Sequence, residues 1–478
     1  HDHYAKEHTI KTSFRYYPEN KVHQMNFGWE QKFNEYQWID VTRPWVGAPI
    51  QINDSASTPS ISIGSSNDIW KVKPNNGGIF FSDKITYKGI IANLGVRFNY
   101  WAPGKFADDA VTNPNAPVID QVRQDYTSNT VKVFGLRYKA RVLPKINVSF
   151  PVTSNNVLYF NYTHSMRLPH PRFVYAGLDP EFQDRSFLSF LGNPDLNPEV
   201  NVSYEVGYKS QIGKNIGLTL AAYNNNRFDY IVSRRVIVND QTGRPVSKTM
   251  YINQDYAKVQ GAEVNLIWRI TKYLRTFSNV AYQLAKGKSN SARESSLQIE
   301  QNGEVPLSSE QYLAWDRPWN INLGVVFAPD TTFKLYGNWM QGMQVYFSSS
   351  YQSGFRYTPM IREGENELGR PEYAPDLNNF LEERATPWIN GDIKITKTFA
   401  NKKRKGITIS LEARNIFNNQ NAQIVNAVTG RAWEPGDDLP NNLRDDRYLG
   451  PEESGTPPSN PARYQAPRQL IFGVSFRL

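Results

Sequence analysis

The sequence predicts an all-β protein, a transmembrane antiparallel β-barrel with about 15 strands in this chain. Apolar and polar residues alternate along long segments, as in strands that have one apolar and one polar face. Short turns and long polar segments also alternate along the chain. No stretch of about 18 apolar residues exists, so no transmembrane helix is expected.

The alternation is clear at 91–101 and recurs at 201–209, 261–270, 407–414 and 469–478. In the first segment the two faces are Ala92, Leu94, Val96, Phe98 and Tyr100 against Asn93, Gly95, Arg97 and Asn99. The expected strands are about 9–15 residues long, which suits a tilted strand that crosses a bilayer. Strands of most globular sheets are shorter.

In chain order, the expected strands are 9–17, 22–36, 78–86, 90–101, 141–152, 157–166, 201–211, 216–233, 247–270, 274–286, 316–328, 332–345, 386–399, 406–417 and 468–478. Short turns are expected at 18–21, 87–89, 153–156, 213–215, 271–273, 329–331 and 401–405. Long polar segments lie at 37–77, 102–140, 167–200, 234–246, 287–315, 346–385 and 418–467. Outer-membrane barrels sort their connections in this way, with tight turns inside and long loops outside. We find no sustained helical period.

The odd strand count has a consequence for the chain's place in a barrel. Bacterial single-chain barrels have even strand numbers, so residue 1 is expected outside the cell. Residues 1–478 are then a single barrel domain, the C-terminal part of a larger barrel whose plug and N-terminal strands are absent from this sequence. An open strand edge in lipid would leave backbone groups unpaired, which costs several kcal/mol for each group.

The composition excludes several classes of protein. With 54 Lys+Arg against 45 Asp+Glu, the net charge is +9, and the chain has no cysteine. Disulfides and thiolate metal sites are therefore excluded. The 11 Trp, 27 Tyr and 25 Phe argue against a disordered chain. The densest basic run, 401–406, lacks interleaved aromatic residues, so no nucleic-acid partner is expected.

Several local strings stand in a set order. They supply Asn193, Pro194, Leu196, Asn197, Pro198 and Glu199, then Gly261 and Glu263, Trp315, Asp316 and Arg317, Asn415, Phe417 and Asn418, and the ending FGVSFRL. This series resembles the barrel of TonB-dependent outer-membrane receptors, in the style common in Bacteroidetes. The resemblance covers the chain from about residue 78 onward.

The resemblance implies a 22-stranded barrel filled by a plug and energised through TonB, the inner-membrane motor. The implied function is import of a specific bulky ligand, such as a siderophore, saccharide or peptide, across the bacterial outer membrane. Implied partners are the lipid bilayer and lipopolysaccharide, the plug, TonB and a surface lipoprotein of the SusD type. A scaffold barrel of an outer-membrane complex and a passive porin remain alternatives.

Two groups of residues are candidates for ligand contact. Glu205, Glu263 and Glu412 alternate with apolar residues, so we expect these charges to face the lumen, where they contact ligand or only solvate the wall. Aromatic residues of the predicted loop 346–385 could grip a ligand or pack within the loop: Tyr346, Tyr351, Phe355 and Tyr357. The Asn-Pro pairs at 193–194 and 197–198 indicate turns.

Enzyme chemistry is not expected, and no cofactor is expected. There is no G-x-S-x-G or H-E-x-x-H motif, and the KGKS string at 286–289 has Tyr282 where a phosphate loop needs glycine. His164 and Ser165 are strand neighbours on opposite faces, so a lipase would need His164 with another serine.

The sequence offers two groups of residues that could bind a metal ion. His1, Asp2 and His3 could ligate a metal only if a further ligand folded back, and a mobile loop end is the alternative. Acidic residues of the last long segment could bind Ca²⁺ or lie in a solvated loop: Asp437, Asp438, Asp445, Asp446, Glu452 and Glu453.

Overall fold

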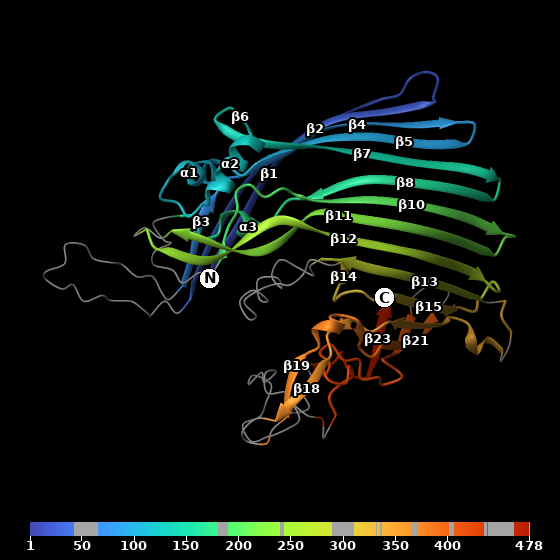
Figure 1. Cartoon of the computed structure of the whole chain (residues 1–478). Coiled ribbons are helices and arrows are strands. Elements are labelled where there is room, and N and C mark those ends of the chain that lie inside the picture. The colour runs from blue at the N-terminus through green and yellow to red at the C-terminus, as the bar shows by residue number, and fades with distance from the viewer. Residues whose placement is uncertain are drawn as a thin grey trace.

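The computed structural model describes residues 1–42, 66–179, 190–239, 243–288, 310–330, 332–334, 337–365, 369, 371–400, 406–434, 437 and 463–477. Within these residues, fifteen long strands form one antiparallel sheet in which each strand pairs with the next (Figure 1). They are β1 (Asp2–Tyr16), β2 (His23–Thr42), β4 (Asn75–Tyr87), β5 (Ile90–Ala102), β7 (Leu136–Thr153), β8 (Asn156–Arg167), β10 (Glu199–Ile212), β11 (Ile216–Asn239), β12 (Pro245–Arg269), β13 (Leu274–Gly287), β15 (Trp319–Phe327), β16 (Met343–Gln352), β21 (Trp388–Ala400), β22 (Gly406–Arg414) and β23 (Gln469–Arg477). The predicted fold class is confirmed.

The strand register separates apolar from polar residues. Directly opposed residues lie on the same face of the sheet, so the pairs Phe81–Val96, Phe98–Val142 and Phe160–Val206 share one face. We call this the apolar face and the opposite one the polar face. Side chains on the apolar face are exposed in the isolated chain, and Phe98 keeps 44 % of its accessible surface. Such a continuous apolar surface indicates contact with lipid.

The two ends of the sheet differ (Figure 1). Tight turns join β4 to β5, β7 to β8 and β10 to β11 at one end. The opposite end, which we call the mouth, carries the longer connections 102–135, 168–179, 190–198, 310–318 and 353–387 with the ends of the strands they join. Residue 1 lies at the mouth and β23 ends on the side of the tight turns, as an odd number of strands requires.

One predicted strand is wrong. The segment 332–345 was expected as a strand after a short turn at 329–331, but β16 begins at Met343, and a short 3₁₀ helix, η1 (Gly337–Met340), precedes it. Phe333 packs its ring against Tyr273 and Phe327, with ring centroids 4.9 and 5.6 Å apart, instead of entering the sheet. The apolar–polar alternation of 345–351 then supplies the strand that pairs with β15 and β21.

The mouth contains helices that the sequence pattern did not indicate. They are α1 (Lys105–Thr112), α2 (Asp120–Asn129) and α3 (Pro171–Tyr175). Each is short, and α1 buries Ala107, Ala110 and Val111 on one side. Helices of this length depend on tertiary packing, so their periodicity is hard to read from sequence. None of the helices within the described residues is long and apolar enough to span a bilayer.

The remaining elements are also short and lie at the mouth. They are β3 (Ser66–Val72), β6 (Val131–Val133), β9 (Phe190–Leu191), β14 (Gln311–Tyr312), β17 (Arg356–Tyr357), β18 (Met360–Glu365), β19 (Pro371–Pro375), η2 (Leu377–Asn379) and β20 (Glu383–Arg384). The hairpin of β11 and β12 also runs through most of the predicted loop 234–246. The described connections at the mouth are therefore more ordered than the prediction of long polar loops implied.

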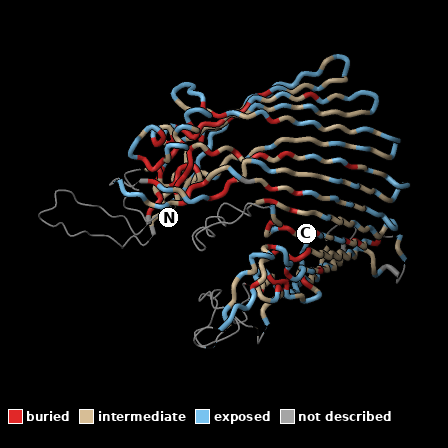
Figure 2. Tube along the Cα trace, viewed as in Figure 1, coloured by how far each residue is buried: buried red, intermediate tan, exposed pale blue. Residues whose placement is uncertain are grey.

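Buried residues gather at the mouth rather than along the strands (Figure 2). One cluster comprises Trp70, Val72, Ala107, Val174, Tyr175, Leu196, Ile231 and Tyr251. A second comprises Ala110, Ala116, Val118, Val122, Leu178, Leu191, Val238 and Met250. Both clusters join residues that are far apart in the chain, so they fix the connections onto the ends of the strands.

Candidate functional site

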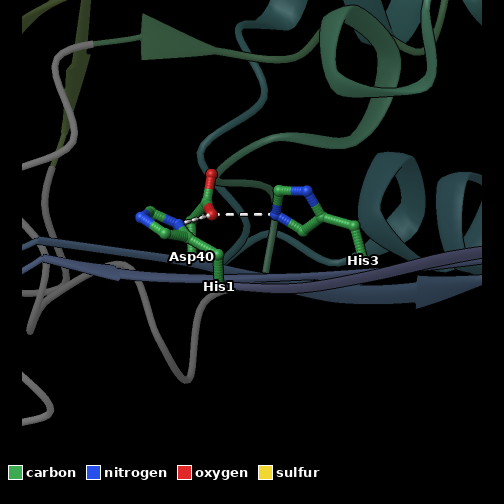
Figure 3. Close-up of side chains that lie close together, drawn as sticks. All are labelled: His1, His3 and Asp40. Carbon is green, nitrogen blue, oxygen red and sulfur yellow. Dashed lines mark hydrogen bonds and ion pairs between the residues drawn. The ribbon is translucent and has the colours of Figure 1, made fainter.

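A compact group of polar and aromatic side chains lies where β1 and β2 enter the mouth (Figure 3). The β1–β2 register places His3 opposite Trp38 and Asp2 opposite Ile39. Because side chains alternate between faces, His1, His3, Trp38 and Asp40 share the polar face, and Asp2 lies on the other face. Asp40 thus supplies the further ligand that the sequence required, and Asp2 does not belong to the group.

The carboxylate of Asp40 is the centre of this group. Its Oδ1 lies 2.8 Å from Nε2 of His3 and is also within hydrogen-bond distance of Nδ1 of His1. Its Oδ2 accepts a hydrogen bond of 3.0 Å from the indole N–H of Trp38. The Trp38 ring stacks on the His3 imidazole with centroids 3.7 Å apart. Both oxygens of the carboxylate and the plane of one imidazole are therefore fixed.

Aromatic rings and an arginine continue the group into the mouth. Trp70 stacks on Trp38 at 5.7 Å, and the Arg172 guanidinium lies over the Trp38 and Phe190 rings at 5.6 and 4.3 Å. Arg172 also pairs with the buried carboxylate of Asp68 at 3.2 Å. Trp70 is buried, whereas the Trp38 ring and the Arg172 guanidinium stay partly exposed at the mouth.

His170 borders the same group, with its ring 5.8 Å from Trp38. Its Nδ1 accepts a hydrogen bond from the backbone N–H of Arg172. Burial lowers the pKa of the His170 imidazole below its ordinary value, and the Arg172 and Arg167 guanidinium groups lower it further. The neutral ring is therefore the form that the mouth favours.

A pocket of about 90 Å³ opens beside α3. Its lining includes Tyr36, Trp101, Leu168, Val174 and Tyr175. The Tyr175 hydroxyl donates a hydrogen bond of 2.7 Å to the carbonyl of Pro103, and burial raises the pKa of this tyrosine. Pockets that enclose a drug-sized molecule hold about 300–1,000 Å³. This pocket is therefore large enough for one side group of a ligand.

The three predicted glutamates lie on the polar face of the sheet. Glu205 is opposite Asn161 and Tyr223, and Glu263 is on β12, two strands away. Glu412 lies on β22 and pairs with Arg414 and Lys394 at 2.6 and 3.1 Å. The structure therefore brings Glu205 and Glu263 near one another and leaves Glu412 apart, within an ion-paired row. Their part in ligand contact stays a prediction.

The predicted aromatic surface is divided. Tyr346 and Tyr351 lie in β16, so their placement in a loop was wrong. Tyr346 is on the polar face opposite Val326, and Tyr351 is on the apolar face opposite Ile321. Phe355 and Tyr357 do lie in the mouth, where the Arg317 guanidinium is 5.6 Å from the Phe355 ring. These four rings do not share one surface.

The residues of the WDRP string hold the mouth together. Asp316 is fully buried; it accepts hydrogen bonds from the backbone N–H of Ala285 at 2.8 Å and from Nε of Arg356 at 3.0 Å. Arg317 lies 3.8 Å from the centre of the Trp388 ring and donates to Gln352. Trp315 is partly exposed beside them. Two connections and β13 are thereby joined.

The Asn-Pro pairs have a similar role. Asn193 donates a side-chain hydrogen bond of 2.9 Å to the carbonyl of Tyr251, and the backbone N–H of Asn197 donates to Asn253 at 2.7 Å. Pro194 and Pro198 are both fully buried. These contacts attach the connection 190–198 to β12.

Further residues of the strings quoted from the sequence are Gly261, Asn415 and Phe417. A Cβ at Gly261 would lie 2.5 Å from the Tyr223 hydroxyl, so this glycine makes room for a cross-strand ring. Asn415 has a φ of 48° and binds the carbonyl of Asn419 through its side-chain amide at 3.0 Å. The Phe417 ring covers Gly391 in the same way. Packing thus accounts for all three.

The other candidates from the sequence either do not lie together in the structure or are outside the described residues. His164 contacts Tyr162 on the apolar face, whereas Ser165 is on the polar face, as predicted. Asp437 pairs with Arg431 at 2.7 Å. The basic run 401–405 and Ser289 lie outside the described residues, as do Asp438, Asp445, Asp446, Glu452 and Glu453. Trp38 and Asp40 were missed because they lie in a predicted loop, and no sequence signal joined them to His3.

Comparison with known proteins identifies the family of the chain. A family model described as TonB dependent receptor-like, beta-barrel matches residues 2–416. An iron-regulated outer membrane virulence protein of Vibrio cholerae is 30 % identical over 105 residues, which are 21 % of this chain and 16 % of that protein.

Solved outer-membrane proteins share the fold. The outer membrane transporter YddB of Escherichia coli has a TM-score of 0.57 at 13 % identity, over 99 % of this chain and 54 % of that one. FpvA of P. aeruginosa bound to a pyoverdine has a TM-score of 0.53 at 12 % identity, over 99 % and 48 %. The copper transporter OprC has a TM-score of 0.52 at 13 % identity, over 99 % and 57 %.

The chain spans about half the length of these solved proteins. Identities this low demonstrate the fold alone, but the family model covers most of the chain. Its family is one of receptors and transporters of the bacterial outer membrane. The chain belongs to the TonB-dependent receptor β-barrel family, and its apolar face is the surface that meets the membrane.

Proposed function

We propose that this chain forms the wall and mouth of a TonB-dependent importer that carries a specific bulky ligand across the outer membrane. The observation that carries the proposal is the match of residues 2–416 to the receptor barrel family. The mouth is consistent with this role, because aromatic rings pack there and the Arg172 guanidinium lies over two of them. The ligand is a siderophore, saccharide or peptide.

In this proposal the polar face lines the lumen and surrounds a plug supplied by a preceding part of the protein. Glu205 and Glu263 then face the plug or the passing ligand, and the ion pairs of Glu412 stabilise the wall. TonB acts on the plug from the inner membrane. Lipopolysaccharide surrounds the outer part of the apolar face, and a SusD-type lipoprotein is a further proposed partner at the mouth.

The ligand first meets the mouth. Trp38 and Arg172 are partly exposed and offer a ring and a guanidinium group, and the pocket beside Tyr175 accepts one side group. Phe355, Tyr357 and the lumen-facing Tyr346 offer further contacts on the other side of the chain. Tyr351 contacts lipid in this scheme and takes no part in binding.

Uptake measurements test the proposal. A strain that carries the complete gene is compared with a deletion strain for uptake of ⁵⁵Fe-siderophores, labelled oligosaccharides and labelled peptides, with and without a proton uncoupler. We expect one ligand class to require both the gene and an energised inner membrane. Uptake that persists with the uncoupler would indicate a passive porin. Absence of uptake for every class, with a stable co-purifying partner, would indicate a scaffold barrel.

A further inference from the structure

We propose that His1, His3 and Asp40 form a binding site for a divalent transition-metal ion, with Zn²⁺ as the representative ion. The site does not depend on the proposed import function. It rests on the convergence of two imidazole nitrogens and one carboxylate oxygen, whose ligand atoms all lie within 4.8 Å of one another (Figure 3). Imidazole and carboxylate are ligands that suit Zn²⁺ and its neighbours in the first transition row.

The backbone places these ligands without strain. His1 directly precedes β1 and His3 lies two residues later in the strand, so their side chains extend from the same face. Asp40 lies on β2, two residues after Trp38 and on the same face. Trp38 is directly opposite His3. The hydrogen-bonded register of fifteen residue pairs between β1 and β2 therefore fixes the carboxylate against both imidazoles.

The spacing of the ligand atoms is close to what a metal requires. Ligand atoms bound at about 2.0–2.1 Å lie roughly 3.4 Å apart in a tetrahedral site. His3 Nε2 and Asp40 Oδ1 are now 2.8 Å apart, so they need to separate by only about half an ångström.

Trp38 supplies the supporting contacts that metal sites need. Its indole N–H occupies Oδ2 of Asp40 at 3.0 Å, which directs Oδ1 toward the two histidines. Its ring stacks on His3 with an angle of 15° between the planes and so orients the imidazole. Contacts of this kind fix ligand geometry, and their loss weakens metal binding by about 10–100-fold.

The surroundings favour a cation and allow it to enter. The Arg172 guanidinium, which lies over the Trp38 ring, is paired with Asp68 at 3.2 Å, so the charge of Asp40 is left for the metal. The His3 side chain is 35 % exposed, which gives a metal ion a path to the ligands from the mouth. Three protein ligands leave at least one coordination position for water or for a donor atom of another molecule.

Calorimetric titration of the full-length protein in detergent with ZnCl₂ tests the site. We expect the unaltered protein to bind one equivalent of Zn²⁺. The affinity for Zn²⁺ should fall at least about tenfold in His3→Gln and in Asp40→Asn, and about 10–100-fold in Trp38→Phe. Matched controls are Asp2→Asn, on the other face of the same strand, and His8→Gln, further along β1. Both should bind as the unaltered protein does.

X-ray absorption at the zinc edge provides a readout that is independent of the variants. It should show imidazole nitrogen and carboxylate oxygen around the bound ion. Zn²⁺ binding that His3→Gln and Asp40→Asn leave unchanged would overturn the site, as would the absence of a stoichiometric equivalent in the unaltered protein. Circular dichroism of each variant checks that the strands are intact, so a misfolded variant is not counted as a loss of binding.

Discussion

Phe98 in the strand wall and Tyr175 in the mouth are both large aromatic residues, yet their surroundings are opposite. Phe98 keeps 44 % of its surface accessible and lies in an apolar row along the sheet, whereas Tyr175 keeps 3 % and packs among residues from distant segments. The wall is held by strand register and by lipid, since it has little buried core of its own (Figure 2). The mouth is held by side-chain packing, as a soluble domain is.

Because of this difference, the effect of a substitution depends on different properties in the two regions. In the wall, the face on which a residue lies decides the effect, because one face meets lipid and the other meets water or a plug. In the mouth, burial and hydrogen-bond partners decide it, because an unpaired polar group there has no water to replace its partner. The following substitutions separate these two rules, from the largest expected effect to the smallest.

Asp316→Ala should have the largest effect. It leaves the buried Arg356 guanidinium without its carboxylate, and breaking a buried ion pair in this way costs about 3–5 kcal/mol. We expect the free energy of unfolding, measured by urea titration in detergent, to fall by that amount. Glu365→Ala removes an exposed ion pair with Arg362 and should cost less than about 1 kcal/mol. Equal costs would show that the mouth is not held by buried contacts.

Phe98→Arg tests the wall. A charge on the lipid face near the middle of the bilayer costs about 2–4 kcal/mol, so assembly into lipid vesicles should be impaired. The matched variant Asn99→Arg places the same charge on the polar face one residue away and should be milder. Assembly is followed by heat-modifiable gel mobility. If both variants assemble equally poorly, the assignment of the two faces is wrong.

Tyr175→Phe removes one buried hydroxyl from the mouth and keeps the ring. The carbonyl of Pro103 then loses its partner, which should lower the free energy of unfolding by about 1–3 kcal/mol. Tyr16→Phe, at an exposed tyrosine of the wall, should have almost no effect. Thermal unfolding of the two variants in the same detergent gives the comparison, and similar shifts would remove the distinction between the regions.

The smallest expected effect is a pH dependence of the mouth. The folded mouth lowers the pKa of His170, so the unfolded chain takes up a proton first as the pH falls. The contribution to stability is therefore complete above a pH of about 6.5 and is lost as the pH falls through the lowered folded pKa. Unfolding midpoints measured between about pH 7.5 and 5 should show this loss, and His170→Asn should reduce it. A midpoint that rises on acidification would contradict the direction.

Strand positions could be predicted because a two-residue period leaves a direct mark on sequence. Fourteen of the expected segments lie largely within a long strand of the sheet, whereas the segment 332–345 meets β16 only at its last three residues, because Phe333 packs on Tyr273 and Phe327 outside the sheet. Helices α1 and α2 were missed because two to three turns give too little periodicity. Asp316 and Asn193 were noticed through family strings, but their buried partners were not.

The sequence by itself determined the fold class, the face of most strand residues and the sorting of short and long connections, because each depends on neighbours in the chain. Only the tertiary structure decided that Asp40 joins His1 and His3 and that Arg356 binds Asp316. Those results depend on strand register and on packing between distant segments. Such contacts leave no period in the sequence. The strands of the wall could therefore be predicted from the sequence, whereas the packing of the mouth could not.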